Sequence, residues 1–336
     1  MDSLTTQALS FEGGLFGPSI VAGVTTSGLY GLVAVALVLS YRISRTIAFV
    51  HGGIVLSGAL LYWYFVTPTY SGGEDILAGL DDGGGGGGRP ELPKWVAVFG
   101  LMLAGAAVAA FYGWIVTSTR MATYPRVTLT NFSLALMLIM VGIIFTKNKS
   151  SGEQAPSPFG GDGFEFPTPG GTVDQRVSYH QLATLIILVA VVIGFAILLQ
   201  RTRFGVYTRA VADNVEASKL VGVPIGKVGT IVYAISGAIA ALGGILIANP
   251  VGTETTGILF IFLRALIVCV LGAFASIPLA LAGAVLIAVI DSMIESGVFG
   301  TPDKAVKEIV VVAILFSVVI GIDRFGKKSS SVLAGH

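Results

Sequence analysis

Residues 182–199 read LATLIILVAVVIGFAILL, a run without a single charged side chain. The stretch that follows, residues 200–227, reads QRTRFGVYTRAVADNVEASKLVGVPIGK and carries charges of both signs. A helix needs about 20 predominantly apolar residues to cross the hydrocarbon core of a bilayer. The apolar run therefore predicts a transmembrane helix, and the charged stretch after it predicts a loop in water.

The composition of the whole chain agrees with a membrane protein. Of its 336 residues 54% are hydrophobic and only 12% are charged, whereas soluble domains carry about 25% charged residues. The formal net charge of +1 argues against a nucleic-acid partner. Cys269 stands alone, and His51, His180 and His336 are far apart. We therefore expect neither a disulfide nor a metal site.

Apolar runs of suitable length recur along the chain. They predict an all-α, polytopic integral membrane protein with about 8–9 transmembrane helices. The second run begins with Thr46, His51, Gly52 and Gly53, so a broken or re-entrant helix is an alternative to a full span there. The candidate spans are residues 18–41, 46–66, 94–117, 127–146, 179–200, 228–249, 257–276, 278–297 and 305–322.

The basic residues between the spans divide unevenly between the two sides. Seven fall on one side with most of the acids, and the larger group falls on the other. Basic loops stay in the cytoplasm, so we expect the N-terminus outside and the C-terminus in the cytoplasm. The larger, cytoplasmic group consists of Arg42, Arg45, Arg120, Arg126, Arg201, Arg203, Arg209, Lys219, Lys227, Arg324, Lys327 and Lys328.

This topology divides the chain into one transmembrane domain, residues 18–325, and two short ends. Residues 1–17 form an extracytoplasmic segment and residues 326–336 a cytoplasmic tail. The two long outer loops, residues 67–93 and 147–178, are rich in Gly and Pro and predict flexible or irregular segments.

The cytoplasmic loop, residues 200–227, contains a candidate short helix. Asp213 or Asn214 can cap it at its beginning, and Val221 and Gly222 would end it, with Pro224 just beyond. A short amphipathic helix between two spans can dock into a groove of another protein. The alternative is an ordinary basic loop that only fixes the topology.

Three segments of the chain resemble one family of transporters. Glu216, Ala217 and Ser218, with Gly222 after a spacer, resemble the coupling-loop motif of ABC importer permeases. The wider stretch 202–222 resembles the branched-chain amino acid permease family, as do RTIAFVHG at residues 45–52 and LGAFASIP at residues 271–278. The resemblance implies that the loop transmits the ATPase stroke through Arg203, Arg209, Glu216, Ala217, Ser218 and Gly222.

The resemblance also implies partners and a location. The permease would be non-catalytic and bind no cofactor, because two cytoplasmic ATPase subunits bind ATP and Mg. A second permease, identical or homologous, completes the pathway in the lipid of a prokaryotic cytoplasmic (inner) membrane, and an extracytoplasmic binding protein delivers the solute. Residues 321–328 approach a nucleotide-binding loop, but Lys328 stands where Ser or Thr is needed.

Polar residues within spans are candidates for contact with the solute, because they are costly in lipid. We select Thr26, Tyr30, His51, Asn131 and Arg264. For the selected residues other than Arg264, the alternative to solute contact is a hydrogen bond between helices. Arg264 could instead snorkel outward or meet an acid such as Glu254. Ala48 stands where the family has asparagine, which leaves the preferred solute open.

The apolar runs and the family resemblance together favour a function as the permease subunit of an ATP-driven importer. The expected solute is a branched-chain or other hydrophobic amino acid, with a related urea, amide or organic acid as the second choice. An ion-gradient-driven secondary transporter is the alternative, and it would need an acid inside the membrane. Glu254, Asp291 and Glu295 are the only acids near spans, and all three are expected close to outer ends. An intramembrane enzyme would need a catalytic cluster, and the sequence shows none.

Small residues also recur every four positions in two late spans. These stripes predict close helix contacts, within the chain or with a second permease. They are Ser236, Ala240 and Gly244 in one span, and Ala280, Ala284 and Ala288 in another.

Overall fold

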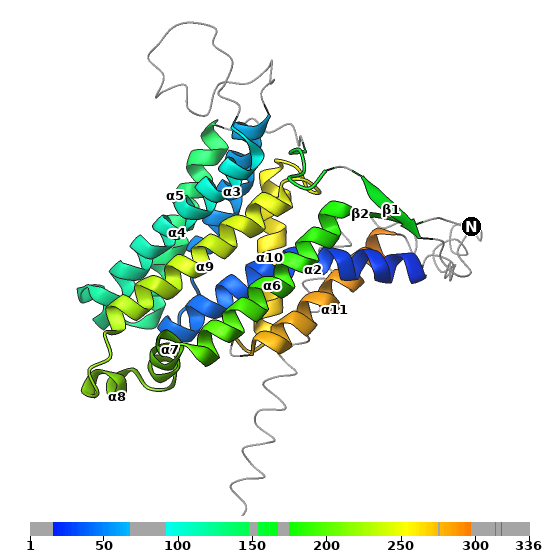
Figure 1. Ribbon diagram of the computed structural model, residues 1–336. Coiled ribbons are helices and arrows are strands. Elements are labelled where there is room, and N and C mark those ends of the chain that lie inside the picture. The colour runs from blue at the N-terminus through cyan, green and yellow to red at the C-terminus, as the bar shows by residue number, and fades with distance from the viewer. Residues whose placement is uncertain are drawn as a thin grey trace, which may run out of the picture.

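The protein is represented by a computed structural model, and nearly all of the described chain is helical (Figure 1). The predicted last span, residues 305–322, lies outside the described part except for two positions, and so do the tail and nearly all of the loop 67–93. The described residues are 16–67, 92–147, 154–160, 162–166, 175–274, 276–296, 313 and 317.

Within these residues, six helices are long and apolar enough to cross a membrane. They are α2 (Phe16–Ser44), α4 (Lys94–Ser118), α5 (Arg126–Lys147), α6 (Tyr179–Arg201), α9 (Ile225–Ile247) and α11 (Ile277–Glu295). Two shorter apolar helices are α3 (Val50–Val66) and α10 (Thr255–Leu271). Each predicted span before residue 298 corresponds to one of these helices, so the helical, polytopic fold class is confirmed.

The helix α3 begins later than its apolar run. Residues 45–49 are not helical, and Arg45 has a φ of 54°. The helix has 17 residues, which is at the short end of the range that spans a bilayer. A Cβ atom on Gly52 would lie 2.9 Å from the ring of Phe262. Gly52 thus allows α3 and α10 to come close at the point where a broken helix was the alternative to a full span.

The helices α2 and α9 form the centre of the bundle. The helix α2 packs against α6, α9, α10 and α11, and α9 packs against α2, α3 and α4 (Figure 1). From Leu32 to Leu39 every side chain of α2 is buried. A helix that is apolar on all sides has no preferred outward face, and here neighbouring helices surround it.

Small residues make the closest contacts within the chain. A Cβ atom on Gly237 of α9 would overlap Ala109 and Gly105 of α4, and one on Gly244 would overlap the Val55 carbonyl of α3. In the second stripe, Ala280, Ala284 and Ala288 are all buried. The predicted stripes are therefore buried contact surfaces inside one subunit.

Part of the outer loop 147–178 has regular structure, so the prediction of a flexible or irregular segment was wrong for residues 163–166 and 175–178. Strands β1 (Gly163–Phe166) and β2 (Gln175–Ser178) pair antiparallel, with Phe164 opposite Val177. Before them, the Ala155 amide donates to the Ala248 carbonyl at 3.0 Å, and the Tyr62 hydroxyl donates to the Pro156 carbonyl at 3.0 Å. These bonds hold residues 154–160 against the ends of α3 and α9.

At the other end of the bundle lie α7 (Arg203–Asp213), α8 (Val215–Leu220) and the 3-10 helix η2 (Arg120–Thr123). The Arg45 guanidinium donates to the Ala212 carbonyl at 2.6 Å, and the Thr117 hydroxyl donates to the Gly226 carbonyl at 3.3 Å. The ends of α2 and α4 and the start of α9 therefore meet near α7 and α8. The described basic residues that were predicted to be cytoplasmic, all before residue 228, gather at this end.

Candidate functional site

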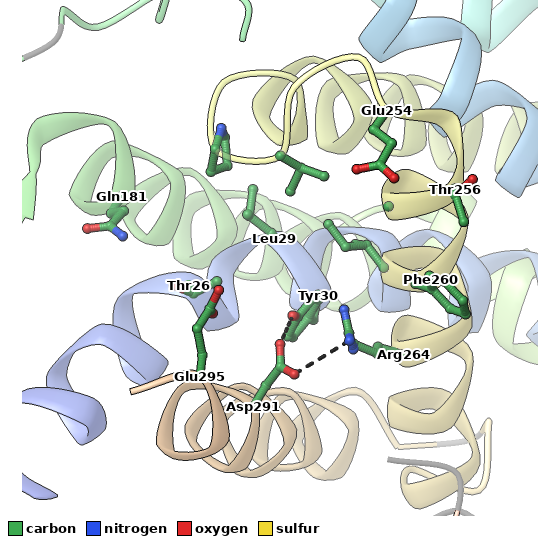
Figure 2. A pocket seen from close by; sticks show the side chains of 14 residues that line it. Thr26, Leu29, Tyr30, Gln181, Glu254, Thr256, Phe260, Arg264, Asp291 and Glu295 are labelled. Atoms are coloured by element: carbon green, nitrogen blue, oxygen red, sulfur yellow. Dashed lines mark hydrogen bonds and ion pairs between the residues drawn. The ribbon is translucent and has the colours of Figure 1, made fainter. Parts of the chain in front are cut away.

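A cavity of about 580 Å³ lies between α2, α10, α11 and the beginning of α6 (Figure 2). It combines polar and charged side chains with apolar ones. Its lining consists of Thr26, Leu29, Tyr30, Gln181, Pro250, Val251, Glu254, Thr256, Gly257, Phe260, Ile261, Arg264, Asp291 and Glu295. Clefts of this size and mixed character are typical of small-molecule sites.

A buried charged pair forms the deep wall of this cavity. Arg264 and Asp291 are each only 6% exposed, and Nη2 of Arg264 lies 3.6 Å from Oδ1 of Asp291. The Tyr30 hydroxyl donates to Oδ2 of Asp291 at 2.6 Å. The three side chains come from α10, α11 and α2, and Figure 2 shows them converging. Pairing offsets the cost of removing each charge from water.

The cavity brings together three of the five residues expected to meet the solute. Thr26, Tyr30 and Arg264 all line it. The Thr26 hydroxyl also donates to the Ala22 carbonyl at 2.8 Å, which is a common arrangement for Thr inside helices.

His51 lies elsewhere, fully buried between α3 and α9. Its Nδ1 is 3.0 Å from the Ala48 carbonyl and its Nε2 is 2.9 Å from the Ser236 hydroxyl. Both ring nitrogens thus have hydrogen-bond partners within the protein. This geometry fits a histidine that connects two helices, which was the alternative to a pathway role.

Asn131 lies at the end of the bundle that carries α7 and α8. It lines a separate cavity of about 280 Å³ together with Arg45 and Arg126. The structure therefore does not place Asn131 with the other candidates.

Asp291 and Glu295 were missed as site residues. Asp291 lies near the end of α11, as expected, but it is also buried, and it pairs with Arg264, for which Glu254 had been named as the protein acid. Two signals could have found the site. A basic residue inside a span often pairs with an acid, and Asp291 and Glu295 stand four residues apart, on one face of a helix.

The predicted short helix in the cytoplasmic loop is present as α8. Asn214, one of the two expected caps, accepts a hydrogen bond from the Ala217 amide at 3.0 Å, whereas Asp213 is the last residue of α7. At the other end Gly222 has a φ of 79°. The Gly222 amide donates to the Lys219 carbonyl and the Val223 amide to the Ser218 carbonyl, at 3.1 and 3.0 Å. This pair of bonds is the Schellman motif, which favours glycine at the left-handed position.

The residues expected to couple to an ATPase lie on or beside α8, and most are exposed. Arg203, Arg209, Glu216, Ala217 and Gly222 are exposed. Ser218 is instead buried, and its hydroxyl donates to the Asn214 carbonyl at 2.8 Å.

The end of α8 carries an exposed apolar surface. Leu220 is 89% exposed and Val221 77% exposed, while Glu216 and Lys219 form an ion pair of 2.9 Å beside them. These two neighbouring apolar side chains form a small exposed patch that another protein could cover.

The cavity and α8 lie at opposite ends of the bundle. The first turn of α6 contains Gln181, which lines the cavity, and the helix ends just before α7. The helix α9 begins just after α8 and ends just before the loop that contains Pro250, another cavity residue. Each of these helices has 23 residues, which corresponds to a length of about 34 Å. Two continuous helices thus connect the two regions.

Comparison with known proteins identifies the family. Residues 19–319 match the model of the family described as branched-chain amino acid transport system / permease component. No solved structure matches the chain.

Curated relatives agree over most of the chain. The high-affinity branched-chain amino acid transport system permease protein BraD of Pseudomonas aeruginosa is 24% identical over 295 residues, covering 85% of this chain and 88% of the relative. The corresponding protein LivH of Escherichia coli K12 is 23% identical and covers 81% and 83%. The galactose/methyl galactoside import permease protein MglC of the same bacterium is 30% identical over 184 residues, covering 54% and 52%.

The family match covers most of the chain, and the apolar helices of the described residues agree with it. This chain therefore belongs to the branched-chain amino acid transport system permease family, as a multi-pass inner-membrane permease component of an ABC importer.

Proposed function

We propose that this chain pairs with a second permease and imports a small solute with energy from two cytoplasmic ATPase subunits. Branched-chain and other hydrophobic amino acids are the first choice of solute, and a urea, an amide or an organic acid is the second. The chain itself binds no nucleotide, and ATP and Mg are held by the ATPase subunits. An extracytoplasmic binding protein delivers the solute.

The observation that carries the proposal is the exposed end of α8. Leu220 and Val221 present apolar surface to water next to the Glu216–Lys219 pair. A groove on an ATPase subunit would bury this surface, in the manner of a helix docking into a groove. The two capped ends keep α8 in a defined position, as a part that transmits movement requires.

The distribution of charge supports the orientation. Arg45, Arg126, Arg203 and Arg209 all lie at the end of the bundle that carries α8. By the preference of basic loops for the cytoplasm, this end faces the ATPases. The cavity then lies toward the outer side, where a binding protein would release the solute.

The docking surface can be tested by site-directed crosslinking. Cys269 is the only cysteine of the chain and is fully buried, so Leu220→Cys supplies one accessible thiol. Tyr179→Cys, exposed at the start of α6 and so at the opposite end of that helix, is the matched control. With a short crosslinker that carries a maleimide for this thiol and a succinimidyl ester for lysine amines, we expect the Leu220→Cys variant to form a covalent adduct with a copurified ATPase subunit, identified by mass spectrometry. Equal adducts from both positions, or none from Leu220→Cys in a transporting complex, would contradict the docking surface.

A further inference from the structure

We propose that the cavity of about 280 Å³ at the end of the bundle that carries α7 and α8 binds a phosphate group. The guanidinium groups of Arg45 and Arg126 hold the phosphate, and the Asn131 amide and the Tyr41 hydroxyl complete the contacts. The location favours an anionic phospholipid as the source of the phosphate. The inference goes beyond the proposed import function, because neither the solute nor the ATPase subunits take part in it.

The cavity lies between the end of α2 and the beginning of α5. Its lining comes from the last turn of α2, from residues 45–47 that follow it, and from the first two turns of α5. Because α5 is one of the helices long enough to cross the membrane, its first turns stand where the membrane meets the water. The described basic residues expected to face the cytoplasm gather at the same end, so the cavity lies at the cytoplasmic surface.

The lining is rich in hydrogen-bond donors, and the described residues that form it include no acid. Arg45 uses one N–H group for the Ala212 carbonyl, at 2.6 Å, and a guanidinium has five. Within the described part of the chain, the Arg126 guanidinium, the Asn131 amide and the Tyr41 hydroxyl have no hydrogen-bond partner. The planar fork of a guanidinium matches the oxygens of a phosphate, so this set of donors suits a phosphate group.

The backbone beside the cavity has an unusual conformation. Arg45 has a φ of 54° and Phe274 a φ of 53°, in the left-handed region that few residues other than glycine adopt. The Phe274 ring packs against the ring of Tyr41, with centroids 4.7 Å apart, so both places lie next to the cavity. Strained backbone of this kind clusters at binding sites. The segments concerned, residues 45–52 and 271–278, have no role in the proposed import.

The surroundings favour a phospholipid over a free anion. Basic pockets between transmembrane helices on the cytoplasmic side bind anionic lipid headgroups. Val127 lines the cavity and is 70% exposed, and Leu134 and Leu138 continue the exposed apolar face of α5 toward the interior of the membrane. An acyl chain can therefore lie along α5 while its phosphate stands between the two arginines.

The proposal can be tested by protection of a single thiol. Cys269 is buried, so Val127→Cys adds one reactive group at the cavity. The complex purified with this chain is kept in dodecyl maltoside, which carries no phosphate, in a phosphate-free buffer without nucleotide, and the rate of maleimide labelling of this chain is measured. Ile197→Cys, on the exposed face of α6 four residues before its end, reports general coverage by lipid.

Three probes are compared. They are phosphatidylglycerol, phosphatidylcholine with the same acyl chains, and inorganic phosphate. The choline group offsets the charge of the phosphate in phosphatidylcholine, so the two lipids differ in net charge and share their apolar part. Inorganic phosphate has the same charged group without an acyl chain, which separates a lipid source from a free anion.

We expect phosphatidylglycerol to protect the thiol of Val127→Cys at a concentration at least about tenfold lower than phosphatidylcholine, the effect of one hydrogen bond to a charged group. Adding Arg126→Gln or Arg45→Gln should raise the phosphatidylglycerol concentration for half protection by at least about tenfold. Lys227→Gln removes a charge from an exposed residue outside the lining and should leave it unchanged. The two lipids should affect Ile197→Cys equally.

Protection by inorganic phosphate that depends on Arg126 in the same way would support the phosphate site, with a free anion as the source. Equal protection by the two lipids, protection that Arg126→Gln leaves unchanged, or no protection by any probe overturns the site. Because labelling requires neither transport nor nucleotide, failure of this proposal is distinct from failure of the import function.

Discussion

Replacing Gly222 by alanine tests whether the exact position of α8 matters for coupling. Gly222 has a φ of 79°, and no atom lies within 4 Å of the place where a Cβ would stand. Alanine therefore fits into the available space and changes only the backbone preference. A side chain in the left-handed region costs ~1–2 kcal/mol, and the cost falls on the residue that ends α8.

The size of the effect follows from the shortness of the helix. The helix α8 has six residues, and isolated helices of fewer than about 12 residues are marginal in water. It therefore depends on its two caps, and losing ~1–2 kcal/mol at one of them lowers the ratio of formed to unformed α8 by about 5–30-fold. We expect Gly222→Ala to reduce ATP-driven uptake while the helices in the membrane remain folded.

The assay is solute uptake into membrane vesicles that contain the whole importer, with the melting temperature of the purified complex as the measure of folding. Gly222→Asn should retain more uptake than Gly222→Ala, because Asn tolerates a positive φ. Gly194→Ala makes the same chemical change on an exposed helical face with no atom nearby and should retain full uptake. Full uptake by Gly222→Ala, or equal losses in all three variants, would refute the reasoning.

Three further predictions concern the packing and charges of the bundle, and each is measured as the thermal stability of the purified complex. Gly237→Val should destabilise the contact between α4 and α9, where even a Cβ overlaps Ala109, whereas Gly100→Val, with open space around it, should be well tolerated; similar losses would contradict the packing. His51→Ala removes a fully buried ring bonded to Ser236 and should cost ~2–4 kcal/mol; an unchanged melting temperature would contradict its role between α3 and α9. Arg264→Leu leaves Asp291 as a buried charge without its cation and should cost ~3–5 kcal/mol. Adding Asp291→Leu should restore part of that loss, and a double variant less stable than Arg264→Leu would argue against the pair.

The transmembrane helices could be predicted from the sequence because the signal for each is local. A run such as residues 182–199 contains all the information that its burial in lipid requires. The same is true of α8, for which Asn214 and Gly222 mark the two ends within a few residues. The resemblance to the permease family depended on these same local patterns.

The site could be predicted only in part, because its residues meet through the tertiary fold. Tyr30, Arg264 and Asp291 come from three helices far apart in the sequence, and no local pattern shows that they converge. The position of Asp291 near the end of its helix could be predicted from one apolar run, but its contacts with Arg264 and Tyr30 depend on two other helices. The hairpin of β1 and β2 was missed for a similar reason, since its strands have only four residues each.

Uptake of radiolabelled L-leucine into membrane vesicles that contain the complete importer tests the central claim most directly. ATP and the ion gradient are supplied separately, with an ionophore to collapse the gradient in one arm and ATP withheld in the other. We expect uptake that requires ATP and the binding protein and survives collapse of the gradient. Uptake that follows the gradient and continues without ATP or the ATPase subunits would contradict the claim that this chain is the permease of an ATP-driven importer.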